Sequence, residues 1–136
     1  MDVYAENILD HYRSPRGKGK TDNATVVHEE INHACGDAIT VYVTIKDGVI
    51  EALSWDGTGC AISQAAMSMV TEEWIGQKTD VILSTSKDDI YNMLGVPIGP
   101  RRFKCALLCL HTLKNALRKA GGLETQSWLD TVEVAE

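Results

Sequence analysis

The chain is predicted to be an α+β protein in which helices cover one face of a three-stranded antiparallel sheet. Alternating apolar and polar residues, typical of half-buried strands, occur only in the first half of the 136 residues. Helix-length segments with apolar residues three and four positions apart dominate the second half, and this order is typical of α+β folds. Because 44% of the residues are hydrophobic, the chain can bury one core. We therefore expect residues 1–136 to form a single domain.

The first expected element is a short helix over residues 3–12, with Tyr4, Ile8, Leu9 and Tyr12 on one side. Proline and glycines break this pattern in the basic run that follows, over residues 13–20. We expect that run, with Arg13, Arg16, Lys18 and Lys20, to be a solvated loop, and a docking surface for an acidic partner loop is the alternative.

Three strands are expected next, over residues 24–31, 38–46 and 49–55. The second strand alternates most clearly, since Ile39, Val41, Val43 and Ile45 all face one way. Asp47-Gly48 is a strong hairpin signal between the second and third strands. The sheet should therefore have one apolar face that helices cover.

Helices are expected over residues 61–76, 87–94 and 104–120, and Gly121-Gly122 should end the last one. Its core side would carry Ala106, Leu107, Leu110, Leu113 and Leu117. Lys114, Arg118 and Lys119 in the final turns would suit the helix dipole. Met67 and Met69 should fill gaps in the core.

Composition excludes several classes of function. The chain has 19 acidic and 13 basic residues, and a net charge of −6 repels a phosphate backbone, so no nucleic-acid partner is expected. It has neither a secretory signal nor the roughly 18 uncharged residues of a membrane span. We expect a cytoplasmic protein, and in that reducing compartment four cysteines indicate thiol chemistry or metal ligation.

Three of the cysteines lie where a loop meets a regular element. Cys35 precedes a predicted strand, and Cys60 and Cys105 each open a predicted helix, where the dipole and unpaired N–H groups favour a thiolate. Asp37 can reach the same centre across Gly36. Three sulfurs and one oxygen at one end of the sheet would be a full set for zinc and an incomplete, labile set for an iron–sulfur cluster. The alternative is a group of separate buried thiols.

Four segments resemble the U-type iron–sulfur scaffold family, which comprises NifU N-terminal domains, IscU and SufU. These segments are ILDHYRSPR (8–16), CGD (35–37), GTGCAIS (57–63) and RFKCA (102–106). They occur in the family's order and cover nearly the whole chain from Tyr4 to about Ala120.

The resemblance implies a scaffold rather than an enzyme. Such a protein accepts persulfide sulfur from a cysteine desulfurase and passes a [2Fe-2S] cluster to downstream carriers or apo-proteins. Cys35, Cys60 and Cys105 match the family's cysteines, which are the candidate persulfide acceptors, and with Asp37 they would hold the cluster. In SufU-like members the same four positions hold zinc. Asp37 is expected to keep the site labile, so alanine there should trap its contents.

Two departures from the family leave the branch open. Lys104 stands where IscU proteins have histidine, and in this respect the chain resembles SufU. The interval from Cys60 to Cys105, however, is too short for the insertion that SufU proteins carry there. The chaperone motif LPPVK of IscU is absent, so dependence on a dedicated Hsp70-type chaperone is not expected. A cluster scaffold is the favoured interpretation, a zinc-bound sulfurtransferase that relays persulfide is the alternative, and a structural zinc module is a third.

Other candidate ligands have simpler interpretations. Cys109 lies one turn beyond Cys105 among leucines and is expected to be buried packing. His33 is expected to be a plain loop residue, although a ligand or proton-transfer role is the alternative. His11 should be structural, and His28 and His111 have no evident partners in the sequence.

Overall fold

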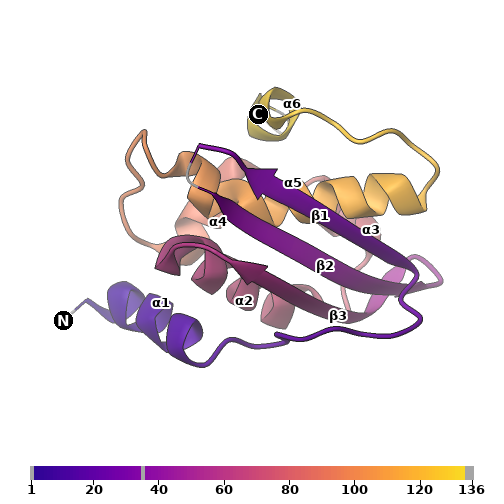
Figure 1. Cartoon of the computed structure of the whole chain (residues 1–136), viewed down its shortest axis with the longest axis horizontal. Helices are drawn as coiled ribbons and strands as arrows, with labels where there is room; N and C mark the ends of the chain where they lie inside the picture. Colours follow the sequence, from indigo (N-terminus) through magenta and orange to yellow (C-terminus); the bar gives the residue numbers. More distant parts are fainter. Residues whose placement is uncertain (1, 35, 134–136) are drawn as a thin grey trace.

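The computed structural model describes residues 2–34 and 36–133 and confirms the α+β class. Figure 1 shows three strands side by side, with α2 and α5 behind them and α6 beyond β1. The sheet is antiparallel in the order β1-β2-β3. The elements are α1 (Val3–Arg13), β1 (Val26–Asn32), β2 (Asp37–Lys46), β3 (Val49–Thr58), α2 (Ala61–Trp74), α3 (Thr79–Leu83), α4 (Lys87–Leu94), α5 (Phe103–Ala120) and α6 (Trp128–Glu133).

The β2–β3 hairpin is the most regular part of the sheet. Asp47 and Gly48 have φ angles of 54° and 74°, as a two-residue turn with left-handed residues requires. Ile39, Val41 and Val43 are fully buried against the helices, as the alternation predicted. Strand β3 runs three residues further than expected, to Thr58, which pairs with Ala38. This extension brings the end of β3 beside the start of β2.

Helix α5 is the centre of the helical layer, because it contacts β1, β2 and the helices α2, α3, α4 and α6. Every residue from Cys105 to Leu117 is buried, so the helix has no solvent face over that length. This differs from the expectation for Lys114, which is 1% exposed and whose Nζ has no hydrogen-bond partner among the described residues. Burial lowers the pKa of Lys114, and the nearby Asp89 opposes that effect.

Helix α1 makes contacts with α2 that the sequence did not indicate. Helix α1 packs on α2 through buried Ile8 and His11, whereas Tyr4 and Tyr12, expected on the same side as Ile8, are 51% and 44% exposed. His11 Nδ1 lies 2.7 Å from Ser68 Oγ, which is consistent with the predicted structural role.

The basic run is a loop in which Arg13, Lys18 and Lys20 are exposed, as predicted, but its backbone also pairs with the edge of β3, which was not predicted. Gly19 N–H donates to Trp55 O at 2.7 Å, and Trp55 N–H donates to Gly17 O at 3.0 Å. Gly17 has a φ of +72°, and a Cβ there would collide with Thr71. Arg16 forms salt bridges with acidic groups of α1 and α2. The segment therefore covers a strand edge that would otherwise be open to pairing.

The C-terminal segment docks through a polar network that the sequence did not reveal. In this network Trp128 stacks on His111 at 4.2 Å between ring centroids, and His111 Nδ1 lies 2.6 Å from Thr131 Oγ1. Burial alone would raise the pKa of Glu30, but hydrogen bonds from His111, His28 and Asn115 lower it to about 2. His28 and His111 therefore do have partners, and both belong to the fold. Leu129, on the same helix as Trp128, is 63% exposed. None of the described helices is long and apolar enough to cross a membrane.

Replacing Lys114 by methionine should stabilise the protein, because it removes a buried amine without a hydrogen bond. We expect the free energy of unfolding at neutral pH to rise by about 1–3 kcal/mol. A folded-state pKa below the unfolded value penalises folding at low pH, and that penalty disappears as pH approaches the unfolded value of about 10.4. The gain should therefore shrink with rising pH in urea-unfolding measurements. Lys46→Met, at an exposed position, is the control, and a loss of stability in K114M would contradict this interpretation.

Candidate metal centre

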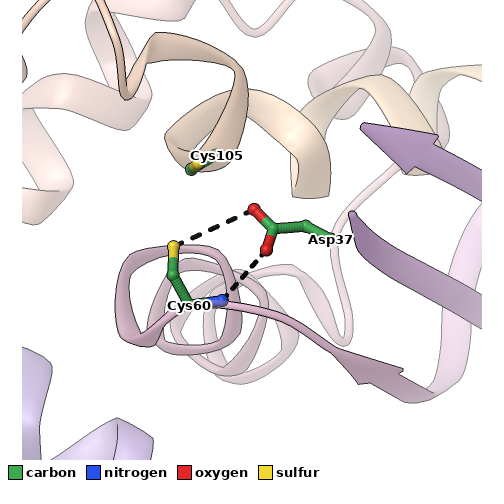
Figure 2. A group of neighbouring side chains, drawn as sticks. All are labelled: Asp37, Cys60 and Cys105. Carbon is green, nitrogen blue, oxygen red and sulfur yellow. Dashed lines mark hydrogen bonds between the residues drawn. The ribbon is translucent and has the colours of Figure 1, made fainter. Parts of the chain in front are cut away.

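Three predicted ligands converge at the end of the sheet where β2, α2 and α5 begin (Figure 2). Asp37 is the first residue of β2, Cys60 is the N-cap of α2, and Cys105 lies in the first turn of α5. The carboxylate oxygen and the two sulfurs all lie within 4.8 Å of one another. Asp37 and Cys105 are 2% and 5% exposed, whereas Cys60 is half-buried.

Pairing of β3 with β2 explains why Cys60 lies beside Asp37. Thr58 pairs with Ala38, and only Gly59 separates that pair from Cys60. Gly59 has a φ of +148°, and a Cβ at this position would collide with the Asp37 carboxylate and the Ser63 hydroxyl. The close approach therefore requires glycine.

The two oxygens of Asp37 have different environments. Oδ1 accepts a hydrogen bond from the backbone N–H of Cys60 at 3.0 Å. Oδ2 lies 3.9 Å from the Cys60 sulfur, as the dashed lines in Figure 2 show. The first contact fixes the orientation of the carboxylate, and the second leaves Oδ2 facing the sulfur. This arrangement suits a carboxylate that binds a metal through one oxygen.

The sulfurs of Cys60 and Cys105 each have an uncharged polar neighbour as well. The Cys60 sulfur lies 3.9 Å from Ser63 Oγ, and Asn32 Nδ2 donates to the Cys105 sulfur at 3.9 Å. Sequence reasoning missed both neighbours. Ser63 is the third residue of α2 after the Cys60 cap, which is where a side chain can reach back to the cap. For Asn32 there was no local signal, because 73 positions separate it from Cys105.

The donor set fits a metal that prefers thiolates. Zn–S bonds of about 2.3 Å in a tetrahedron place the ligand atoms roughly 3.5–3.8 Å apart, so only small shifts would close this group around an ion. Cys60 and Cys105 both lie at helix starts, where the dipole stabilises an anionic sulfur. The described group supplies three ligands. Cys35, predicted as another, lies outside the described residues, and its role stays a prediction.

The other candidates do not join this group. Cys109 is fully buried, its sulfur donates to Ala106 O at 3.6 Å, and burial raises its pKa to about 12, so the predicted packing role is confirmed. His33 is exposed. Lys104 Nζ lies 5.8 Å from the ring centroid of Trp128, a cation–π contact with α6. Among the described residues the metal-ligating group consists of Asp37, Cys60 and Cys105.

Comparison with known proteins identifies the family. Residues 3–124 match the family model described as the NifU-like N terminal domain. The chain therefore belongs to this family, and the resemblance inferred from its motifs is confirmed.

Three relatives illustrate the family. The iron-sulfur cluster assembly scaffold protein IscU of Thermotoga maritima is 36% identical over 133 residues, covering 86% of this chain and 94% of that protein. The zinc-dependent sulfurtransferase SufU of Bacillus subtilis is 32% identical over 137 residues, covering 88% and 92%. The crystal structure of FiSufU, a SUF-system protein from Fervidobacterium islandicum, has a TM-score of 0.74 at 30% identity, covering 82% and 94%. These names span both interpretations that the sequence left open.

Replacing Gly59 by alanine should separate the ligands, because the added Cβ would displace the Asp37 carboxylate. We expect zinc affinity to fall by about 10- to 100-fold, measured by competition with a chromophoric chelator. Gly99→Ala is the matched control, since a Cβ at Gly99 would meet nothing within 4 Å. Equal zinc affinities of the two variants would show that the Gly59 approach does not shape the site.

Proposed function

We propose that the chain is an iron–sulfur cluster assembly scaffold acting as a single domain. It accepts persulfide sulfur from a cysteine desulfurase and holds a labile [2Fe-2S] cluster or metal ion on Cys35, Asp37, Cys60 and Cys105. Downstream carriers or apo-proteins then receive the cluster. The observation that carries the proposal is the convergence of Asp37, Cys60 and Cys105 from three different elements. Membership of the family and 36% identity to a named IscU scaffold support it.

Sulfur acceptance requires a thiolate that a partner can reach. The thiolate attacks the outer sulfur of the desulfurase persulfide, a new S–S bond forms as the old one breaks, and the desulfurase cysteine leaves as a thiolate. Cys35, Cys60 and Cys105 are the candidate acceptors. Of the two that the structure describes, Cys60 is the more exposed.

Release of the cluster requires a ligand that is readily displaced. An iron–sulfur cluster is normally held by four cysteine thiolates, and a carboxylate oxygen is a harder and poorer ligand for its iron. Asp37 supplies such an oxygen, already oriented by the Cys60 N–H group. The site is therefore suited to carrying a cluster rather than keeping one permanently.

The alternative function is a zinc-bound sulfurtransferase that stimulates a desulfurase and relays persulfide. It is supported by 32% identity to a SufU described as zinc-dependent, and by Lys104, whose ammonium cannot ligate a metal. Zinc bound at the site would hold the sulfurs as thiolates at neutral pH. The short interval between Cys60 and Cys105 favours the scaffold.

Anaerobic incubation with a desulfurase, cysteine and ferrous iron distinguishes the two functions. For a scaffold we expect visible sulfur-to-iron charge-transfer bands, followed by colour transfer to an apo-ferredoxin. For a relay we expect one tightly held zinc and a mass increase of one sulfur atom, without colour. Absorption spectroscopy and intact-protein mass spectrometry report these outcomes. A protein that acquires neither iron, zinc nor sulfur would contradict both.

Replacing Asp37 by alanine should trap the cluster. Removing the most easily displaced ligand closes the route of exchange, so we expect transfer to an apo-ferredoxin to slow by about tenfold or more. Circular dichroism of the acceptor cluster measures the rate. Asp56→Ala, which removes a carboxylate of β3 outside the ligand group, is the control. Faster transfer from D37A would contradict the role proposed for this carboxylate.

A further inference from the structure

Ser63 is a buried hydroxyl placed against one sulfur of the candidate centre. It is fully buried in the first turn of α2 and lies 3.9 Å from the Cys60 sulfur. Its hydroxyl donates to the Cys60 carbonyl oxygen at 3.0 Å, while the Cys60 thiol donates toward the serine. A metal that replaces the thiol proton would remove that donor. The hydroxyl can then turn or share its hydrogen toward the sulfur.

Asn32 is placed against the other described sulfur. It is the last residue of β1, is 2% exposed, and donates from Nδ2 to the Cys105 sulfur at 3.9 Å. Its Oδ1 accepts a hydrogen bond from the backbone N–H of Ala34 at 3.2 Å. That bond identifies which end of the amide is oxygen, and so the NH₂ group is the end that faces the sulfur.

These contacts become stronger when the sulfur loses its proton to a metal. A neutral thiol is a weak acceptor, whereas hydrogen bonds to an ionised acceptor are shorter and roughly twice as strong. Hydrogen bonds to metal-bound sulfur withdraw electron density from it and tune the centre. They also make the sulfur a poorer nucleophile.

We propose that Ser63 and Asn32 are positioning residues, each of which hydrogen-bonds one metal-bound sulfur and lowers its nucleophilicity. Ser63 acts on Cys60 and Asn32 acts on Cys105, so two elements remote in sequence control the two sulfurs independently. The inference rests on the proposed function, because it concerns these sulfurs in their metal-bound form. It adds two residues of this chain that restrain sulfur reactivity without binding the metal.

The test is the alkylation of zinc-loaded protein by iodoacetamide, followed cysteine by cysteine with peptide mass spectrometry. Ser63→Ala should raise the alkylation rate of Cys60 by about fivefold, the value of one ordinary hydrogen bond, and leave Cys105 unchanged. Asn32→Ala should raise the alkylation rate of Cys105 by a similar factor and leave that of Cys60 unchanged. Ser63→Thr keeps the hydroxyl and should restore the slow rate at Cys60.

Ser68→Ala is the matched control for general loosening of the fold. Ser68 lies on the same helix, is also fully buried, and bonds to His11 and to the backbone N–H of Arg16 rather than to sulfur. We expect it to leave the ratio of the Cys60 and Cys105 rates unchanged even if it lowers the melting temperature. A Ser63→Ala variant that changes both rates equally, or neither, would overturn the inference.

The zinc content of each sample, measured before alkylation, separates two kinds of failure. Wild-type protein that binds no zinc would overturn the proposed metal site and this inference with it. Wild-type protein that binds one zinc, with rates that do not respond to Ser63 or Asn32, would overturn this inference alone.

Discussion

The hydrogen bond from the Cys60 N–H group to Asp37 Oδ1, 3.0 Å long, is the interaction on which the site depends. It joins the start of β2 to the start of α2 and directs the other carboxylate oxygen toward the Cys60 sulfur. The bond forms only because Gly59 has no side chain, since a Cβ there would occupy the space of the carboxylate. The register of the β2–β3 hairpin therefore also determines how Asp37 and Cys60 are arranged.

Helix α5 contributes Cys105 to the site, and packing of the whole helix holds this residue in place. It is buried on all sides from Cys105 to Leu117, and packing against the sheet and the other helices fixes its position. This packing therefore keeps Cys105 near Asp37. The same packing encloses the amine of Lys114, which has no hydrogen bond among the described residues and so reduces the stability of the fold. Trp128 adds a further restraint on this helix, through His111 and Lys104.

The parts that could be predicted from sequence are those with a local signal. Alternation in β2, the Asp47-Gly48 turn and the helical spacing of α5 led to the correct sheet order and to the longer helices, whereas the short helices α3 and α6 were not predicted. The convergence of Asp37, Cys60 and Cys105 was predicted from their positions at loop ends and from the resemblance of four motifs. Contacts between distant segments had no such signal, and Asn32 beside Cys105 and the network that docks α6 are the examples. Pairing of Gly17 and Gly19 with β3 was missed because a basic, glycine-containing run is typical of a loop.

The most direct test of the central claim is X-ray absorption spectroscopy of the zinc-loaded protein. If Asp37, Cys60 and Cys105 hold the metal, the spectrum should show sulfur neighbours at about 2.3 Å together with an oxygen neighbour at about 2.0–2.2 Å. A first shell made only of nitrogen and oxygen, without sulfur, would contradict the account.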